Sequence, residues 1–122
     1  WIMLGTNDLL QERQFTAEDT AQRMEAFLQK IMAEPAVSDG KITLRLIAPA
    51  RMEYGAWVDE ERLYLESRRL GEEYRKIAER MEIEFADAGK WEIPVVYDGV
   101  HFSEEGHHIF AQKIQEELAW LK

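Results

Sequence analysis

Two side chains near the end of the chain have the types and spacing of an acid–base pair. Asp98 precedes His101 by three residues in Asp98-Gly99-Val100-His101. A carboxylate this close can accept a hydrogen bond from one imidazole nitrogen, which fixes the tautomer and stabilises the imidazolium formed when the other nitrogen takes a proton. Gly99 permits the tight turn that such a contact requires. The pattern indicates a general base, and a purely structural histidine is the competing interpretation.

A second group suited to chemistry lies at the other end of the chain. Asn7 belongs to the turn-like cluster Gly5-Thr6-Asn7-Asp8, which follows the apolar run Trp1–Leu4. Its amide NH2 can donate to developing negative charge, as an oxyanion hole requires. The alternative is an Asn that caps a helix or closes a turn.

A metal site is the other chemistry that the histidines permit. Asp98, His101 and His107 are three candidate ligands of a hydrolytic ion. However, the chain has no pair of histidines four residues apart on a helix, and no further carboxylate or histidine is an obvious ligand. We therefore predict no metal and no cofactor, with a metal hydrolase as the alternative.

The predicted strands and helices, which must position these residues, alternate along the chain. Short apolar runs predict the strands, and apolar residues at helical spacing predict the helices. The order is a strand over residues 1–4, a helix capped by Thr16 and stopped by Pro35, a strand over 42–48, a helix over about 59–81, a strand over 83–86 and a helix capped by Ser103. The apolar side of the last helix comprises Ile109, Phe110, Ile114, Leu118 and Leu121.

This alternation predicts a parallel sheet covered by helices. In such sheets the chemistry lies beyond the carboxyl ends of the strands. Three segments meet that condition, namely Gly5–Leu10, Pro49–Trp57 and Asp87–Phe102. We therefore expect Asn7 and His101 to face a common cleft, with the loop Pro49–Trp57, Trp91 and Tyr97 as candidates for the lining of a substrate pocket.

Composition excludes several classes of function. The chain has 122 residues, which suits one domain, and Lys plus Arg number 15 against 24 for Asp plus Glu, a net charge of −9. This balance argues against binding nucleic acid or an anionic membrane surface, because both need a basic face. There is no cysteine, so disulfides, thiol nucleophiles and thiolate metal sites are excluded. No apolar run approaches the ~20 residues of a membrane span. The absence of cysteine favours a cytoplasmic location and is also compatible with export.

Two blocks of the sequence resemble signature blocks of the SGNH hydrolases, also called GDSL esterases/lipases. They are Ile2-Met3-Leu4-Gly5-Thr6-Asn7-Asp8 and Asp98-Gly99-Val100-His101-Phe102-Ser103-Glu104-Glu105-Gly106-His107. The resemblance implies a flavodoxin-like, three-layer αβα fold with a parallel sheet. It also implies that Asn7 is the oxyanion donor, that His101 is the general base and acid, and that Asp98 orients His101. The residues of the first block most resemble those of small bacterial arylesterases and carbohydrate acetylesterases. This resemblance implies that the substrates are small-molecule or carbohydrate esters with short acyl chains.

The family also has a serine nucleophile and a glycine block, and both precede the Gly-x-Asn-Asp block. Ser38, Ser67 and Ser103 do not stand at the carboxyl end of a predicted strand. We therefore expect residues 1–122 to be the C-terminal part of a single SGNH domain that carries its last three strands. Such a part is expected to be inactive unless a missing N-terminal segment or a swapped neighbour completes the sheet.

A function of a different class is a non-catalytic binding or assembly module on the same scaffold. Assembly into homo-oligomers through the bare edge of the sheet remains open under both hypotheses, since apolar sheet edges tend to pair.

Overall fold

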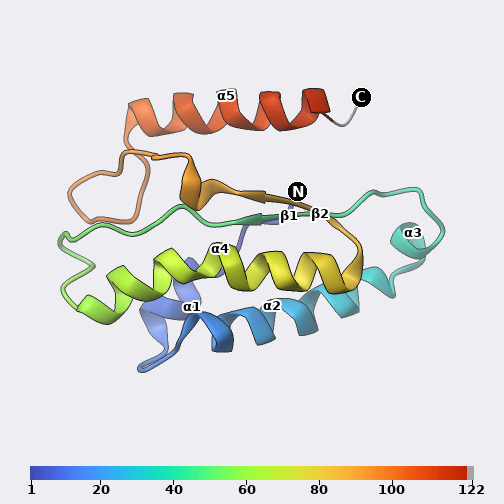
Figure 1. The fold of residues 1–122 in the computed structure, drawn as a ribbon, viewed down its shortest axis with the longest axis horizontal. Helices are drawn as coiled ribbons and strands as arrows, with labels where there is room; N and C mark the ends of the chain where they lie inside the picture. The colour runs from blue at the N-terminus through green and yellow to red at the C-terminus, as the bar shows by residue number, and fades with distance from the viewer. Residues whose placement is uncertain (121–122) are drawn as a thin grey trace.

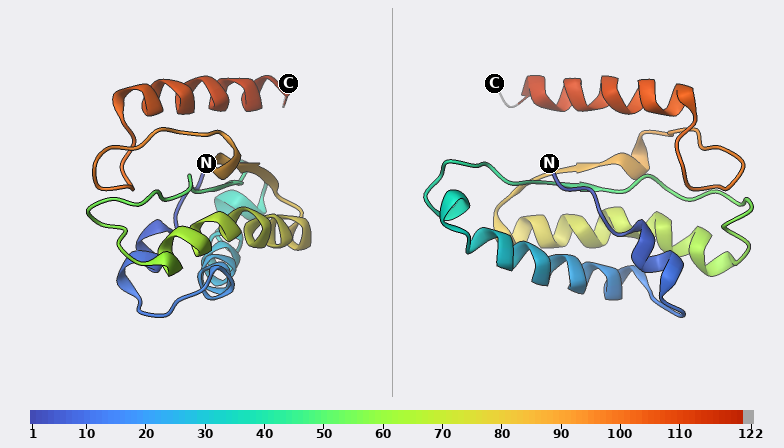
Figure 2. Two further views of the ribbon diagram at one scale, coloured as in Figure 1. Left: turned by 60° about the vertical axis from the view of Figure 1, so that its left-hand side comes forward. Right: turned by 180° about the vertical axis from the view of Figure 1, so that it is seen from behind.

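The computed structural model describes residues 1–120, without the side chains of residues 118–120. A small parallel sheet lies between two layers of helices (Figures 1 and 2). Strands β1 (Arg45–Ala48) and β2 (Glu84–Asp87) pair in parallel, with Leu46 opposite Phe85. The fold is therefore α/β with a parallel sheet, as the alternation of elements predicts.

The third expected strand, over residues 1–4, is reduced to a single bridge. Ile2 pairs in parallel with Leu46, donating its N–H to the Arg45 carbonyl at 2.9 Å and accepting from the Ile47 N–H at 2.8 Å. Two residues later the Leu4 carbonyl accepts the hydroxyl of Tyr74 instead of a strand neighbour. The chain has thus left the sheet by Leu4, and the order across the sheet is Ile2, β1, β2.

The helices divide between the two faces of the sheet. Those below the sheet in Figure 1 are α1 (Thr6–Gln11), α2 (Ala17–Met32) and α4 (Glu61–Met81), and the one above it is α5 (Glu104–Trp120). A short helix α3 (Pro35–Ser38) follows α2, and a 3₁₀ turn η1 (Ala88–Lys90) follows β2. Among the described residues, none of the helices is both long and apolar enough to cross a membrane.

Local signals explain where the helices begin and end. Thr16 and Asp19 form a reciprocal capping box at the start of α2, as the predicted N-cap requires. Pro35 was expected to stop this helix, but α2 already ends at Met32 and Pro35 opens α3, because proline at a first helical position has no N–H to satisfy. Glu82, in a left-handed conformation with φ of 55°, ends α4.

The predicted strand boundaries differ from the observed ones by a few residues. The strand expected over 42–48 begins only at Arg45, and Ile42 is exposed. The strand expected over 83–86 begins at Glu84 and includes Asp87. Pairing explains both shifts, because Arg45 and Glu84 are opposite each other at the start of the ladder and their side chains form an ion pair.

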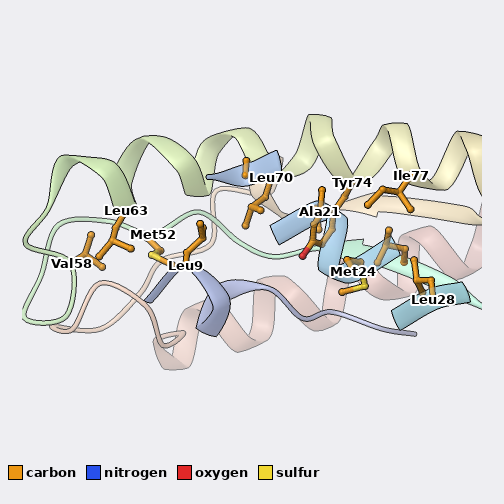
Figure 3. Close-up of a cluster of buried hydrophobic side chains, with 13 residues drawn as sticks. Leu9, Ala21, Met24, Leu28, Met52, Val58, Leu63, Leu70, Tyr74 and Ile77 are labelled. Atoms are coloured by element: carbon orange, nitrogen blue, oxygen red, sulfur yellow. The ribbon is translucent and has the colours of Figure 1, made fainter. Parts of the chain in front are cut away.

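The main core lies between α4, α2 and the sheet. Figure 3 shows its side chains along the length of α4, where Leu63, Leu70, Tyr74 and Ile77 are buried and Met81 is partly buried. The cluster of buried residues comprises Leu9, Ala17, Ala21, Met24, Leu28, Leu46, Ala48, Met52, Val58, Leu63, Leu70, Tyr74 and Ile77.

A smaller cluster lies beneath α5 on the other face. It is centred on Ile47, Ala86, Ala88 and Ile93, with Ile109, Phe110 and Ile114 of the helix packed against it. The side chains of Leu118 and Leu121, expected on the same face, lie outside the described residues.

Candidate active site

Residues from all three segments at the carboxyl ends of the strands line one cavity of about 430 Å³. Its lining comprises Met3, Leu4, Gly5, Thr6, Asn7, Asp8, Pro49, Ala50, Val100, His101 and Phe102. Asn7 and His101 are more than ninety positions apart in the sequence, and the structure brings both to this cavity. The expected convergence of the carboxamide and the imidazole is therefore observed.

Asp98 and His101 form a close pair at the edge of this cavity. The Nδ1 of His101 lies 2.6 Å from Oδ2 of Asp98. The other carboxylate oxygen, Oδ1, accepts the backbone N–H groups of Val100 at 2.8 Å and His101 at 2.9 Å. Asp98 is only 3% exposed, whereas the His101 side chain is 60% exposed. The carboxylate thus fixes the ring from behind and leaves Nε2 as the nitrogen available for proton transfer.

Hydrogen bonding determines the charge on Asp98. Burial alone would raise the pKa of this carboxyl, but the backbone N–H groups of His101 and Val100, together with the His101 ring, hold the pKa below its ordinary value. Asp98 is consequently ionised at neutral pH. An ionised Asp98 accepts a proton-bearing Nδ1, and in this tautomer of the neutral ring the lone pair that can act as a base is on Nε2.

A neighbouring loop supports the Asp98–His101 turn through its backbone. Gly99 has a φ of +84°, and a Cβ at this position would overlap the carbonyl oxygen of Glu53, so the turn requires glycine. The Gly99 carbonyl accepts the Glu53 N–H at 2.9 Å, and the Asp98 carbonyl accepts the Trp57 N–H at 3.0 Å. The loop expected to line the pocket is therefore joined directly to the turn that carries the histidine.

Asn7 lies in the first turn of α1, where a simple turn was expected. The short helix forms because Leu9 is fully buried in the core and anchors it. Asn7 itself is exposed, and no hydrogen bond joins its amide to another described residue. Its neighbour Asp8 instead lies 3.5 Å from Arg23. The amide of Asn7 is therefore available to a ligand in the cavity.

Tyr74 of α4 fixes the chain just before Asn7, a role that sequence reasoning missed. Its hydroxyl donates to the Leu4 carbonyl at 2.8 Å, and its ring is fully buried. Burial, with a smaller contribution from the Asp8 carboxylate, raises the pKa of Tyr74, so the phenol keeps the proton that it donates. Gly5 has a φ of +134°, and a Cβ there would overlap this hydroxyl.

Substituting Gly5 by alanine should therefore destabilise the protein strongly. We expect the free energy of unfolding in denaturant to fall by about 3 kcal/mol or more, because backbone strain and a clash in a packed site add together. Gly40→Ala is the matched control, since its φ of +85° is also positive but no atom lies within 4 Å of the added Cβ. It should cost only about 1–2 kcal/mol, the price of a left-handed conformation. Equal losses in the two variants would contradict the role of the Tyr74 contact.

The three serines are engaged elsewhere in the structure. The Ser67 hydroxyl accepts the Met52 N–H and donates to the Tyr64 carbonyl. Ser103 accepts the Gly106 N–H and so caps α5 as predicted, while Ser38 donates to the Pro35 carbonyl. None of these serines lines the cavity that Asn7 and His101 share, in which Thr6 supplies the hydroxyl among the described residues.

Other candidates lie away from the cavity. His107 is exposed and its ring packs edge-on against Phe102. In the described part of the chain, no group of three or more His, Asp or Glu side chains is arranged to hold a metal ion. Trp91 packs against Phe110 under α5, which removes it from the candidate pocket lining, and Tyr97 is 81% exposed and does not line the cavity.

Two solved esterase structures share this fold. One is Est24, a carbohydrate acetylesterase from Sinorhizobium meliloti, with a TM-score of 0.82 and 23% identity over 99% of this chain and 60% of that chain. The other is the aryl esterase of M. smegmatis, with a TM-score of 0.82 and 22% identity over 99% of this chain and 60% of that chain. At these identities the likeness concerns the fold, and this chain spans about three fifths of the length of either structure.

The sequence itself matches a family model over most of its length. The match covers residues 1–109 and so includes both sequence blocks singled out above. No curated protein matches the sequence significantly. The chain belongs to the GDSL-like lipase/acylhydrolase family, whose SGNH signature blocks it resembles.

Proposed function

We propose that the complete protein is a serine ester hydrolase and that residues 1–122 contribute Asn7, His101 and Asp98 to its active site. The observation that carries the proposal is the cavity itself, which Asn7 and His101 share while Asp98 holds Nδ1 of the imidazole at 2.6 Å. Membership of an acylhydrolase family supports the reaction class. Two solved structures of the same fold are a carbohydrate acetylesterase and an aryl esterase, and on this basis we propose carbohydrate acetates or aryl esters as substrates.

The proposed reaction proceeds through an acyl-enzyme. Nε2 of His101 takes the proton of a serine hydroxyl as its oxygen attacks the ester carbonyl, and the amide of Asn7 with backbone N–H groups holds the resulting oxyanion. The tetrahedral intermediate collapses, the bond to the alcohol breaks, and His101 returns the proton to the leaving oxygen. His101 then activates a water molecule in the same way, which releases the carboxylic acid and restores the serine.

The nucleophile in this proposal comes from a segment outside residues 1–122. The hydroxyls of all three serines are bonded within the structure and away from the cavity. We place this segment on the side of Ile2 that faces away from β1, because a strand pairing there would lie beside the exposed side chain of Trp1. Residues 1–122 alone are accordingly proposed to be inactive.

Labelling with a fluorophosphonate probe tests this proposal, because the probe reacts with activated serines. The full-length protein should be labelled at a serine outside residues 1–122 and should hydrolyse p-nitrophenyl acetate, whereas residues 1–122 alone should do neither. Labelling of Thr6 or of one of the three serines here would contradict the assignment of the nucleophile. An unlabelled and inactive full-length protein would favour the binding or assembly module.

The contribution of Asn7 can be measured in the full-length enzyme. Asn7→Ala should lower kcat for p-nitrophenyl acetate by roughly 10²–10³, the usual effect of losing one oxyanion donor, with little change in KM. Asn7→Asp is the matched variant, because it keeps the shape of the side chain but replaces the donor with a negative charge. It should be no more active than Asn7→Ala. Recovery of activity in Asn7→Asp would show that Asn7 acts through packing rather than through its N–H groups.

A further inference from the structure

A second, smaller cavity adjoins the one that Asn7 and His101 share. Its volume is about 290 Å³, and Asn7, Leu10, Gln11 and Trp57 line it. Asn7, whose amide is proposed to hold the oxyanion, lines both cavities and so lies at their junction. The two substituents of a carbonyl bound at Asn7 can therefore point into different cavities.

Trp57 connects this second cavity with His101. The rings of Trp57 and His101 meet edge to face, with centroids 5.0 Å apart and planes at 80°. The backbone holds Trp57 in place, because its N–H donates to the Asp98 carbonyl and the adjacent Gly55 and Val58 exchange hydrogen bonds across a tight turn. Despite this rigid backbone, the side chain is 51% exposed. The indole ring of Trp57 therefore lies beside the imidazole and is not part of the buried core.

The chemistry of ester cleavage distinguishes the two sides of the carbonyl. The oxygen of the alcohol must receive its proton from His101, so the alcohol portion lies on the His101 side. Trp57 is the aromatic ring in contact with His101, and Leu10 and Gln11 continue the surface away from it. A flat ring on the alcohol can stack on the indole, and Gln11, which lines the same cavity, offers an amide to polar substituents of that ring.

We propose that the cavity between Trp57 and α1 is the subsite for the alcohol portion of the substrate and that it accepts a single ring. This inference rests on the proposed esterase function and specifies its substrate class as esters of ring-bearing alcohols. The cavity volume of about 290 Å³ lies just below the range of small-molecule sites, roughly 300–1,000 Å³, and suits one ring rather than a long chain. Phenols and sugars share the required feature, a ring with an apolar face.

Steady-state kinetics of the full-length enzyme tests the subsite. The substrates are phenyl acetate, methyl 6-O-acetyl-glucoside and ethyl acetate, and the quantity compared is the ratio of kcat/KM between variant and wild type for each ester. This ratio cancels the intrinsic reactivity of each leaving group. Trp57→Ala should lose about tenfold or more on at least one of the ring esters and less than about threefold on ethyl acetate, since only the former lose a stacking partner. The ring ester that is affected identifies the phenol or the sugar as the preferred alcohol.

Two further variants are controls for misfolding and for a loss of activity that is the same for every ester. Trp57→Phe keeps a ring and should retain most of the preference for ring esters. Tyr97→Ala removes another exposed aromatic ring from the paired loop, outside both cavities, and should leave all three ratios unchanged. In methyl esters of acetate, butyrate and hexanoate, Trp57→Ala should leave the order of acyl preference as it is in the wild type.

Three outcomes would overturn the inference. An equal loss of activity on all three acetates would assign Trp57 to positioning His101, and a change in acyl preference would assign the cavity to the acyl portion. In both of these cases the esterase function itself would stand. A wild-type enzyme that hydrolyses none of the esters would instead overturn the proposed function together with the subsite.

Discussion

Replacing His101 by alanine in the full-length enzyme is expected to lower kcat/KM for p-nitrophenyl acetate by about 10⁴-fold or more. The reason is that one nitrogen serves every step of the proposed reaction, taking the proton of the serine, returning it to the alcohol and then activating water. The remaining activity would come from Asn7 and from substrate binding alone. Burst kinetics under the same conditions should show no release of p-nitrophenol in the first turnover, because acylation itself needs the base.

The chain supplies a matched control for this variant. His108 is exposed on α5 and does not line the cavity. His108→Ala should therefore keep the kcat/KM of the wild type. Because the His101 side chain is 60% exposed, added imidazole should enter the space left in His101→Ala and restore part of the activity. Activity of His101→Ala within tenfold of the wild type would exclude this histidine as the general base.

The parts of the site that sequence predicts well depend on local geometry or on a rule of topology. Asp98 and His101 are three residues apart, so a tight turn at Gly99 is sufficient to join them, and the observed contact is of this kind. Asn7 is remote in sequence, but its place after an expected strand was enough, because parallel strands end at one edge of the sheet. The cavity that both residues line follows from that rule.

The parts that sequence did not predict depend on contacts between distant elements. The hydrogen bond from Tyr74 to the Leu4 carbonyl joins residues 70 positions apart. In the sequence, Tyr74 is only one of the apolar positions of a predicted helix. The edge contact of Trp57 with His101 arises because two irregular loops are joined by backbone hydrogen bonds. Irregular loops have no periodic sequence pattern from which such a contact could be predicted. Strand limits were wrong by one to three residues for a similar reason, since the register between β1 and β2 decides them.

Asp98→Asn should reduce kcat by about 10⁴-fold, an effect comparable to that of removing the histidine. Asparagine can keep Oδ1 as the acceptor of the Val100 and His101 N–H groups, so the turn is preserved. Its NH2 group then faces Nδ1 of His101, which must become the acceptor, and the ring proton moves to Nε2. A protonated Nε2 cannot take the proton of the serine. The measurement is single-turnover acylation, with circular dichroism to verify the fold.

The same variant separates the catalytic role of the carboxylate from its effect on stability. The pKa of Asp98 is lowered in the folded protein, so the ionised carboxylate stabilises the fold above its unfolded pKa of about 3.9, and this contribution is lost as pH falls through the lower folded value. The free energies of unfolding of wild type and Asp98→Asn should therefore differ at pH 6–7 and converge in acid. The alternative outcome is that the two free energies of unfolding differ by the same amount at every pH while kcat of Asp98→Asn is still reduced. The carboxylate would then act on the tautomer of His101 without stabilising the turn. The reason is that protonating a stabilising charge must lower the free energy of unfolding of the wild type.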